Sequence, residues 1–453
     1  MGLMPYPDRI RVLLLAEMCN PAWTSVPLVG YQLARALAQH PALEVTVVTQ
    51  VRNRSYLDSD PLRQHAEVCY IDNESIARPM HRLARLLRRG DRLSWTLDTA
   101  MMWPGYVVYE QMVQRRFGRD LQRGRFDLIH RITPLSPTIP SPLASLCRTP
   151  MVLGPINGGL PWPKDHPDLR RREREWFGPF RKLSRLLPYY RSTYRCLAGL
   201  ITGSRFTAAQ VPTCFHGLHL SMPENGVDPE RFPLASRWPE PHGPFRFISV
   251  ARLVPLKGMD IILEALAGSE RLRNCELVVA GEGPERSRLE RMARERGLHG
   301  VRFLGWLDQR AIALELQRAQ VFVLPSLKEF GGGAVLEAMA AALPCVVVDY
   351  GGPAELVADE TGIRLPMCQR PELISRLRYA LEQLTVDFQR CRSLGAAAAQ
   401  VVRQEHVWSA KAERIIELYC DLLAARLPVR RPRMAASSHA VATIAQAGER
   451  SCP

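Results

Sequence analysis

Pro325-Ser-Leu-Lys-Glu-Phe-Gly-Gly-Gly-Ala-Val-Leu-Glu337 decides the fold of this 453-residue chain, because three consecutive glycines separate two glutamates. Residues 320–326 are expected to form a strand and residues 334–342 a helix, so the glycines fall in the turn that opens the helix. The unpaired N–H groups and the positive dipole end of such a helix attract an anion. The stretch therefore predicts a strand–turn–helix unit with a site that would suit a sugar nucleotide.

Apolar runs rich in Val, Ile and Leu recur between helical stretches on both sides of the chain's midpoint. Their ranges are 10–16, 45–49, 127–130, 152–154 and 200–203 in the first series, and 245–250, 276–280, 301–304, 321–325 and 345–349 in the second. Continuous apolar strands that alternate with helices indicate parallel sheets covered on both faces. The expected fold class is α/β, with two doubly wound Rossmann-like domains facing a central cleft.

A run of prolines and glycines over residues 223–243 indicates the break between the domains. We expect a first, acceptor-binding domain over residues 1–225 and a second, nucleotide-sugar-binding domain over 226–405. A helix within 406–427, with Ile415, Leu418 and Leu422 on one stripe, is expected to return to the first domain. Residues 428–453, rich in Ala, Arg, Pro and Ser, are expected to be disordered.

Composition narrows the class of protein further. Hydrophobic residues make up 46% of the chain and charged residues 23%, which is ample for folded globular domains. No run reaches the roughly 18 to 20 apolar residues of a membrane-spanning helix, and the first residues lack the order of a signal peptide. A cytoplasmic location is therefore expected. The eleven scattered cysteines contain no Cys-x-x-Cys pair, so neither disulfides nor structural zinc are expected.

Basic residues are concentrated in the first half. Residues 1–225 hold 30 of the 60 Lys and Arg but only 18 of the 45 Asp and Glu, a net charge of +12 against +3 for the remainder. Two stretches have the pattern of basic amphipathic helices: Arg78, Arg82, Arg85, Arg89 and Arg92 opposite Leu83, Leu86, Leu87 and Leu93, and Arg181, Lys182 and Arg185 opposite Trp176, Phe180, Leu183 and Leu187.

Such helices suit an anionic membrane surface, so peripheral contact with the inner face of the cell membrane is one expectation. A helix packed on the sheet with a solvated Arg face is the alternative. No nucleic-acid partner is expected, because no recognised binding motif accompanies the charge and the aromatic residues line apolar stripes.

Two further motifs in the second half would place charge at the ends of strands. Arg252 and Lys257 follow the strand at 245–250, where a guanidinium fork and a compact ammonium could hold a diphosphate. Two ordinary solvated cations are the alternative for this pair alone. The turn Gly281-Glu-Gly-Pro284 follows the next strand and is weak evidence by itself.

In this order and spacing, roughly residues 200–365 resemble the retaining glycosyltransferases of family four, which have the two-domain GT-B fold. The matching residues are Asn225-Gly-Val-Asp228, Arg252 with Lys257, Gly281-Glu-Gly-Pro284, Glu329 with Glu337, and Gly351-Gly352. The resemblance implies metal-independent transfer from a nucleoside-diphosphate sugar of the UDP, GDP or ADP type, without a cofactor. A saccharide or a lipid-linked molecule would be the acceptor.

The resemblance also implies roles for single residues. Arg252 and Lys257 would bind the diphosphate, Glu337 the ribose hydroxyls and Glu329 a hydroxyl of the transferred sugar. The expected donor-binding set is Gly30, Arg252, Lys257, Glu282, Glu329, Phe330, Gly331, Gly332, Gly333, Ala334 and Glu337, and the expected catalytic set is Arg252, Lys257, Glu329 and His130. Asn157, Gly158 and Gly159 are expected to bind the acceptor, with a simple tight turn as the alternative.

The sequence departs from the family pattern at three places. The position two residues after the first glutamate, usually aromatic, is Gly331, and Phe330 precedes it. Of the glycines that often follow the first strand, only Gly30 could serve. Where the family often has a pair of histidines, the second place is Ile132, so His130 is equally compatible with a catalytic and a structural role.

No metal site is expected. Asp58-Ser-Asp60 matches the Asp-x-Asp pattern of metal-dependent glycosyltransferases, but it lies in a polar stretch without supporting ligands and is interpreted as a solvated turn. The function expected is retaining sugar transfer to an acceptor hydroxyl in the synthesis of a cell-surface polysaccharide or glycolipid. A sugar-nucleotide epimerase or phosphorylase of the same fold, and a non-catalytic membrane-surface protein, are the alternatives.

Overall fold

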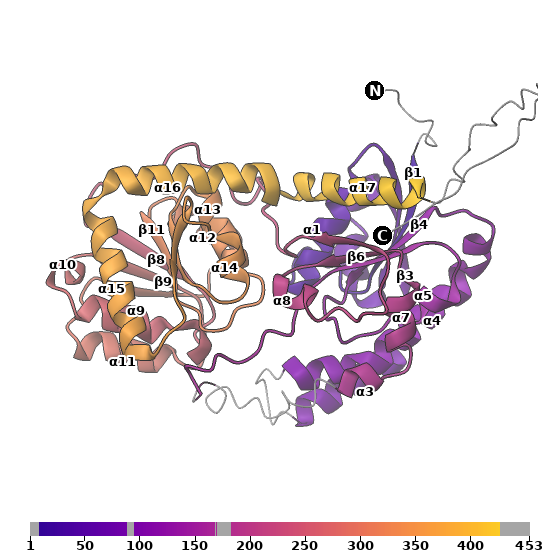
Figure 1. Cartoon of the computed structure of the whole chain (residues 1–453), viewed down its shortest axis with the longest axis horizontal. Helices are drawn as coiled ribbons and strands as arrows, with labels where there is room; N and C mark the ends of the chain where they lie inside the picture. Colours follow the sequence, from indigo (N-terminus) through magenta and orange to yellow (C-terminus); the bar gives the residue numbers. More distant parts are fainter. Residues whose placement is uncertain (1–8, 88–94, 168, 170–182, 426–453) are drawn as a thin grey trace, which may run out of the picture.

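The computed structural model describes residues 9–87, 95–167, 169 and 183–425, with side chains described outside 87 and 95–100. Two α/β domains lie side by side, each built on one parallel sheet (Figure 1). The predicted disordered tail lies outside the described residues. The two-domain α/β prediction is confirmed.

The first sheet has seven strands in the order β3-β2-β1-β4-β5-β6-β7. Their bounds are Ile10–Ala16 (β1), Leu43–Gln50 (β2), Ala66–Ile71 (β3), Leu128–Thr133 (β4), Met151–Ile156 (β5), Gly199–Thr202 (β6) and Leu218–Ser221 (β7). Strand β1 pairs in parallel with β2 and β4, with Leu13 opposite Thr46 on one side and Ile129 on the other. This strand order reverses beside β1, which places ligands beyond the carboxyl ends of β1 and β4.

The second sheet repeats the same order with six strands, β10-β9-β8-β11-β12-β13. Their bounds are Arg246–Val250 (β8), Glu276–Ala280 (β9), Val301–Gly305 (β10), Val321–Leu324 (β11), Cys345–Val348 (β12) and Gly362–Leu365 (β13). Strands β11 and β12 are apolar throughout because helices cover both faces of the sheet. The switch in strand order falls between β8 and β11, so the loops after these strands form the edge where a ligand is expected.

Helices cover both sheets (Figure 1). Those of the first domain are Val26–Ala38 (α1), Arg54–Leu57 (α2), Glu74–Leu87 (α3), Trp95–Gln122 (α4), Leu143–Leu146 (α5), Tyr190–Cys196 (α7) and Arg205–Ala208 (α8). Those that follow β8 are Met259–Ala267 (α9), Glu270–Arg273 (α10), Arg286–Glu295 (α11), Gln309–Leu316 (α12), Gly333–Ala340 (α13), Gly352–Leu356 (α14), Arg370–Val386 (α15), Phe388–Val401 (α16) and Trp408–Ala424 (α17).

The last two helices run along one side of the molecule and bridge both domains (Figure 1). Helix α16 packs in the core of the second domain, whereas α17 packs beside α1 in the core of the first. The predicted stripe of Ile415, Leu418 and Leu422 is buried in that first core, because its 3.6-residue spacing keeps one face of α17 on the sheet.

The chain passes between the domains near Val227 and again near His406, and these two passages are hydrogen-bonded to each other. Val227 donates its backbone N–H to the carbonyl of His406, and Trp408 donates to the carbonyl of Val227, at 2.8 and 3.2 Å. The boundaries at 225/226 and 405/406 remain a proposal, and this pairing of the two passages supports it.

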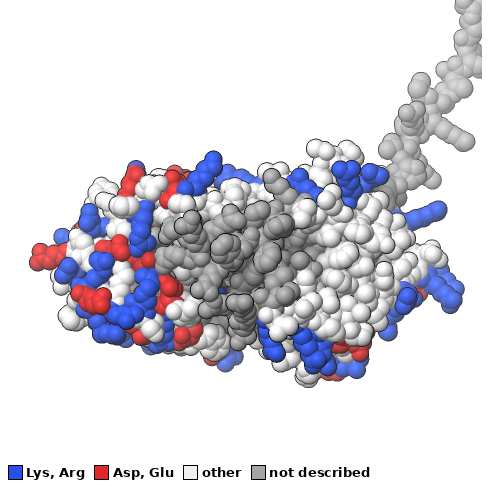
Figure 2. Space-filling view, turned by 90° about the horizontal axis from the view of Figure 1, so that it is seen from below, with Lys and Arg blue, Asp and Glu red and all other residues white. Residues whose placement is uncertain are grey.

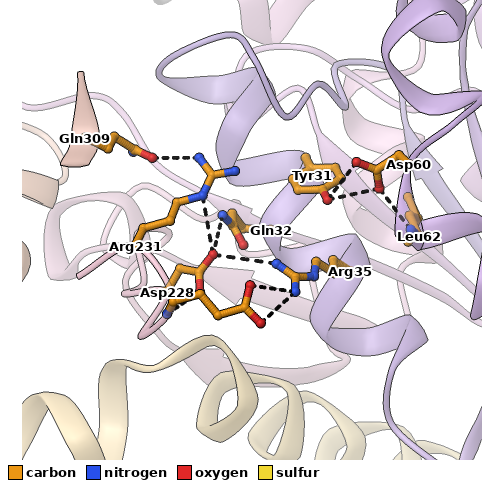
Figure 3. Close-up of polar contacts among 9 residues, drawn as sticks. Tyr31, Gln32, Arg35, Asp60, Leu62, Asp228, Arg231 and Gln309 are labelled. Carbon is orange, nitrogen blue, oxygen red and sulfur yellow. Dashed lines mark hydrogen bonds and ion pairs between the residues drawn. The ribbon is translucent and has the colours of Figure 1, made fainter. Parts of the chain in front are cut away.

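A polar cluster ties the first passage to both domains (Figure 3). The carboxylate of Asp228 accepts a 3.1 Å hydrogen bond from Gln32 of α1, and the guanidinium groups of Arg35 and Arg231 lie 3.7 and 3.5 Å away. Arg231 in turn donates to Gln309 of α12 at 2.6 Å. Helix α1 of one domain and helix α12 of the other are therefore linked through one buried carboxylate.

Candidate active site

The loops after β8 and β11 bring the predicted phosphate and sugar residues together. Lys257 and Glu329 form an ion pair, and both side chains are mostly buried. The two loops are fastened by backbone contacts, since the carbonyl of Leu256 accepts from the N–H of Leu327 at 2.8 Å and from the hydroxyl of Ser326 at 3.2 Å. The ammonium and the carboxylate are thus held at one end of the sheet.

Arg252 lies in the same loop as Lys257 but is exposed, and it makes no ion pair with any described residue. Its guanidinium is free to meet an anion from solution. The predicted residue Glu282 follows β9, where its backbone carbonyl accepts from the N–H of Leu253 at 2.9 Å. Its carboxylate pairs with Arg286. The Glu282 carboxylate is directed at Arg286 of α11. The contact of Glu282 with the loop that carries Arg252 is therefore made by its backbone carbonyl.

Helix α13 begins at Gly333, with Gly332 in the left-handed conformation before it, as the glycine turn predicts. The amides of its first turn lack helical carbonyl partners. Glu337 lies one turn further along α13, and burial raises the pKa of its carboxyl to about 8. No side chain in the described part of the chain hydrogen-bonds this carboxyl. A donor with hydroxyl groups could supply such a partner.

Gly331, the position usually aromatic in the family, is enclosed by the passage between the domains. A Cβ atom there would lie 2.2 Å from Oε1 of Glu224 and 2.2 Å from Nδ2 of Asn225. Glu224 is buried, and burial raises its pKa. The buried Glu224 carboxylate occupies the space that an aromatic side chain would need, which is the physical reason for the departure.

Asn157 of the first domain reaches the second domain. Its Nδ2 donates to the carbonyl of Phe330 at 3.0 Å and to the carboxylate of Glu224 at 2.8 Å, while its Oδ1 accepts from Ser204 and Thr207. Both N–H groups and the oxygen of this amide are thus used within the protein. The N–H and the carbonyl of Gly158 bond the Thr207 hydroxyl, and the carbonyl of Gly159 accepts from Gln210.

His130 is fully buried in β4, away from these loops. Its Nε2 lies 2.7 Å from the carbonyl of Gly154 and its Nδ1 lies 2.6 Å from the hydroxyl of Tyr419 in α17. Burial lowers the pKa of the ring to about 4, so the ring is neutral, Nε2–H donates and Tyr419 donates to Nδ1. Neither nitrogen is available to a substrate in this arrangement.

Gly30 lies inside helix α1. A Cβ atom at Gly30 would lie 2.1 Å from the carbonyl oxygen of Met18 in the loop after β1, so the glycine allows the helix to approach that loop.

The Asp-x-Asp pair has protein partners. Asp58 accepts from Arg63 and Tyr70. Asp60 accepts from Tyr31 and from the N–H of Leu62 (Figure 3). Within the described ranges no group of three His, Cys, Asp or Glu residues is placed to hold a metal ion.

Two contacts between the domains were not predicted from sequence. Nζ of Lys328 lies 3.7 Å from the ring centre of Trp162, and the N–H of Arg205 donates to both carboxylate oxygens of Glu355 at 3.0 Å. Neither pair has a local sequence signal, because each joins residues about 150 or more positions apart. Lys328 and Glu329 are adjacent, so the first of these contacts bears on the predicted sugar residue.

Two sheets of order 3-2-1-4-5-6, facing each other through loops that carry a lysine–glutamate pair and a glycine-opened helix, define the GT-B class of fold. Residues 232–400, which lie within the second domain, match the family described as glycosyl transferases group 1.

Two known relatives are similar to this chain over part of its length. The chain is 34% identical over 215 residues to a glycogen synthase of Mycobacterium tuberculosis, covering 46% of this chain and 49% of that protein. It is 30% identical over 176 residues to a GDP-mannose-dependent monoacylated alpha-(1-6)-phosphatidylinositol monomannoside mannosyltransferase of Corynebacterium glutamicum, covering 37% and 45%. The chain spans about half the length of these relatives.

The solved structure of a sucrose-phosphate synthase from Thermosynechococcus elongatus superposes with a TM-score of 0.64. It covers 92% of this chain and 100% of its own, at 20% identity, and so supports the fold alone.

Proposed function

We propose that the protein is a retaining glycosyltransferase that moves a sugar from a nucleoside-diphosphate sugar to an acceptor hydroxyl. The observation that carries this proposal is the pairing of Lys257 with Glu329 at the carboxyl ends of β8 and β11. Arg252, exposed and free of ion pairs with described residues, and the start of α13 complete a positive site on the same edge. The group 1 domain spans all of these residues.

In the proposed reaction the bond between the sugar carbon and the diphosphate oxygen breaks, and the acceptor oxygen forms the new bond on the same face. Charge builds on the leaving oxygen, and Arg252, Lys257 and the first amides of α13 would stabilise that charge. The acceptor proton passes to the leaving phosphate, so no protein base is required. Glu329 would orient a sugar hydroxyl and Glu337 would accept from the ribose.

A panel of UDP-, GDP- and ADP-sugars tests the proposal by thermal stabilisation and slow hydrolysis. A ligand at 100 times its Kd should stabilise the fold by about 2.7 kcal/mol. Product analysis with and without an acceptor separates transfer from epimerisation or phosphorolysis. Transfer that persists in EDTA would support a metal-independent reaction. If no sugar nucleotide raises the melting temperature, the proposal is wrong.

We also propose that helix α3 brings the enzyme to an anionic membrane that carries a lipid-linked acceptor. Arg82 and Arg85 are exposed, and Leu83 and Leu86 beside them are exposed as well, Leu86 by 76%. The helix packs on α4 elsewhere, as shown by the buried Ala84. In Figure 2 this face of the first domain is mostly uncharged, with Lys and Arg and few Asp or Glu at its rim, whereas both signs mix on the second domain.

The remaining residues of both predicted basic stretches lie mainly outside the described ranges, and Leu183 and Leu186 at the edge of the second stretch are exposed. No helix in the described part of the chain combines the length and hydropathy needed to cross a bilayer. Flotation with vesicles containing anionic lipid tests the contact. Arg82→Glu with Arg85→Glu should abolish flotation, and failure of the wild type to float would reject the membrane proposal alone.

A further inference from the structure

The segment that follows β5 leaves the first domain and lies on the second (Figure 1). The carbonyl of Pro161 accepts from the Tyr350 hydroxyl at 2.8 Å, and Nε2 of His166 lies 3.0 Å from the carbonyl of Cys368. Leu169 is buried in the core of the second domain. We call residues 157–167 the crossing segment. It covers the loops after β11 and β12, the edge where the donor is proposed to bind.

Two contacts from this segment flank Glu329 on either side in the sequence. The ring of Trp162 lies 3.7 Å from Nζ of Lys328, which is 9% exposed. The amide of Asn157 donates to the carbonyl of Phe330 at 3.0 Å. Both neighbours of Glu329 are therefore held by the first domain, while the Glu329 carboxylate pairs with Lys257 of the second.

The other donor residues do not depend on the crossing segment in this way. Arg252 and Lys257 lie in the loop after β8, and the amides of Gly333 and Ala334 open α13, all within the second domain. A nucleoside diphosphate could therefore bind these groups whether or not the domains are closed. The position of Glu329, in contrast, is set from both domains.

We propose that Trp162 and Asn157 are positioning residues that place Glu329 for sugar transfer when the two domains are closed. The proposal rests on the proposed function and deepens it, because it assigns the diphosphate to one domain and the orientation of the sugar to both. The proposal predicts that loss of the contacts made by Trp162 and Asn157 lowers turnover and leaves the affinity for the nucleoside diphosphate unchanged.

Trp162→Ala tests this prediction, with Lys164→Ala as the matched control. Lys164 is exposed in the same segment and forms no hydrogen bond or ion pair with a described residue. The nucleoside diphosphate that stabilises the wild type is titrated by calorimetry, and turnover of the matching sugar nucleotide is measured. Trp162→Ala should lower kcat about tenfold, the fold-change that corresponds to a desolvated cation–π contact of about 1.4 kcal/mol. The Kd should stay within about twofold, and Lys164→Ala should match the wild type.

Two further variants separate positioning from folding. Trp162→Phe keeps an aromatic face and should restore most of the turnover. Lys328→Met removes the cation and keeps the apolar stem, so it should lower kcat at least as much as Trp162→Ala, because Nζ also lies 5.7 Å from the ring centre of Phe330. The double variant should lose less than the product of the two single effects. If Trp162→Ala does not fold, the kcat and the nucleoside-diphosphate Kd of Lys328→Met decide whether the contact positions Glu329.

Each outcome bears on a separate claim. Wild-type turnover in both Trp162→Ala and Lys328→Met would overturn the positioning role and leave the proposed function standing. Parallel loss of nucleotide affinity and turnover would show a merely structural role and also overturn it. A wild type that neither binds a nucleoside diphosphate nor uses a sugar nucleotide would refute the proposed function, and the positioning proposal with it.

Discussion

The hydroxyl of Tyr419 lies 2.6 Å from Nδ1 of His130, a contact between residues 289 positions apart. It fastens α17, the helix that returns from the second domain, to the central strand β4 of the first. The ring of His130 is neutral because burial lowers its pKa to about 4. Protonation would place a positive charge on a fully buried ring, so acid should weaken this junction.

The first prediction concerns the pH dependence of stability. The unfolded chain binds a proton at His130 near pH 6.5, whereas the folded chain does so only near pH 4. The stabilising contribution of the neutral ring is therefore complete above pH 6.5 and is lost as the pH falls toward 4. At about 1.4 kcal/mol per pKa unit the loss is about 3 kcal/mol.

His130→Gln should remove this contribution, which can be measured as the difference between the urea-unfolding curves of wild type and variant at pH 7 and pH 5. Tyr419→Phe, which keeps the ring packing and removes the donor, should cost about 1 kcal/mol at pH 7. A difference between wild type and His130→Gln that is the same at both pH values would contradict the prediction.

The second prediction concerns Lys257, which pairs with Glu329. Lys257→Ala should lower turnover about 10²- to 10³-fold, the range typical of losing one donor to a developing oxyanion. The measurement is steady-state transfer with the sugar nucleotide that stabilises the wild type. Lys164→Ala controls for loss of a lysine, and wild-type turnover in Lys257→Ala would refute the phosphate role.

The third prediction concerns Glu337, whose carboxyl has a pKa raised to about 8 by burial. The folded chain keeps this proton over pH 4.5 to 8, where the unfolded chain has released it. The contribution to stability is therefore present below pH 4.5 and is lost as the pH rises through 8. Glu337→Gln should flatten this slope in the ligand-free protein. Glu337→Ala should weaken donor binding with the fold intact, and unchanged donor affinity by calorimetry would exclude the ribose role.

The interior strands were predictable because a strand buried on both faces must be apolar along nearly its whole length, as β11 and β12 are. Three outer strands were missed. β3 carries Glu67 and Tyr70 among its apolar residues, β7 is mostly exposed, and β13 contains Arg364. A strand with one neighbour needs less apolar surface, so its sequence resembles a loop.

The residues of the candidate site also fall into a group that the sequence could predict and a group that it could not. Lys257 and Glu329 could be predicted because each lies in a short motif directly after a strand, and the sheet order brings such loops together. The contacts of Asn157 and Trp162 with the second domain could not be predicted from the sequence, because they depend on how one domain lies on the other. His130 illustrates the same limit, since its partner Tyr419 belongs to the last helix.

The fourth prediction concerns Gly331. Gly331→Ala would place a methyl group 2.2 Å from the side chains of Glu224 and Asn225, which must then move. Overpacking of this kind costs about 1 to 3 kcal/mol, measurable as a lower melting temperature. Gly243→Ala is the matched control, because nothing lies within 4 Å of its Cβ position. Equal melting temperatures for the two variants would contradict the prediction, because they would show that the side chains of Glu224 and Asn225 move aside at no cost in stability.

The last prediction concerns the polar cluster between α1 and α12 (Figure 3). Asp228→Asn removes the one carboxylate that faces both Arg35 and Arg231, and its side chain is only 10% exposed. Two guanidinium groups would then share a site without the negative charge between them, which should cost about 3 kcal/mol of the unfolding free energy. Glu230→Gln is the control: its side chain is 71% exposed and bonds Arg35 alone, so it should cost less than about 1 kcal/mol. Thermal unfolding of both variants measures the difference. If Glu230→Gln were as damaging as Asp228→Asn, the link between the domains would depend on the exposed pair and not on the buried carboxylate.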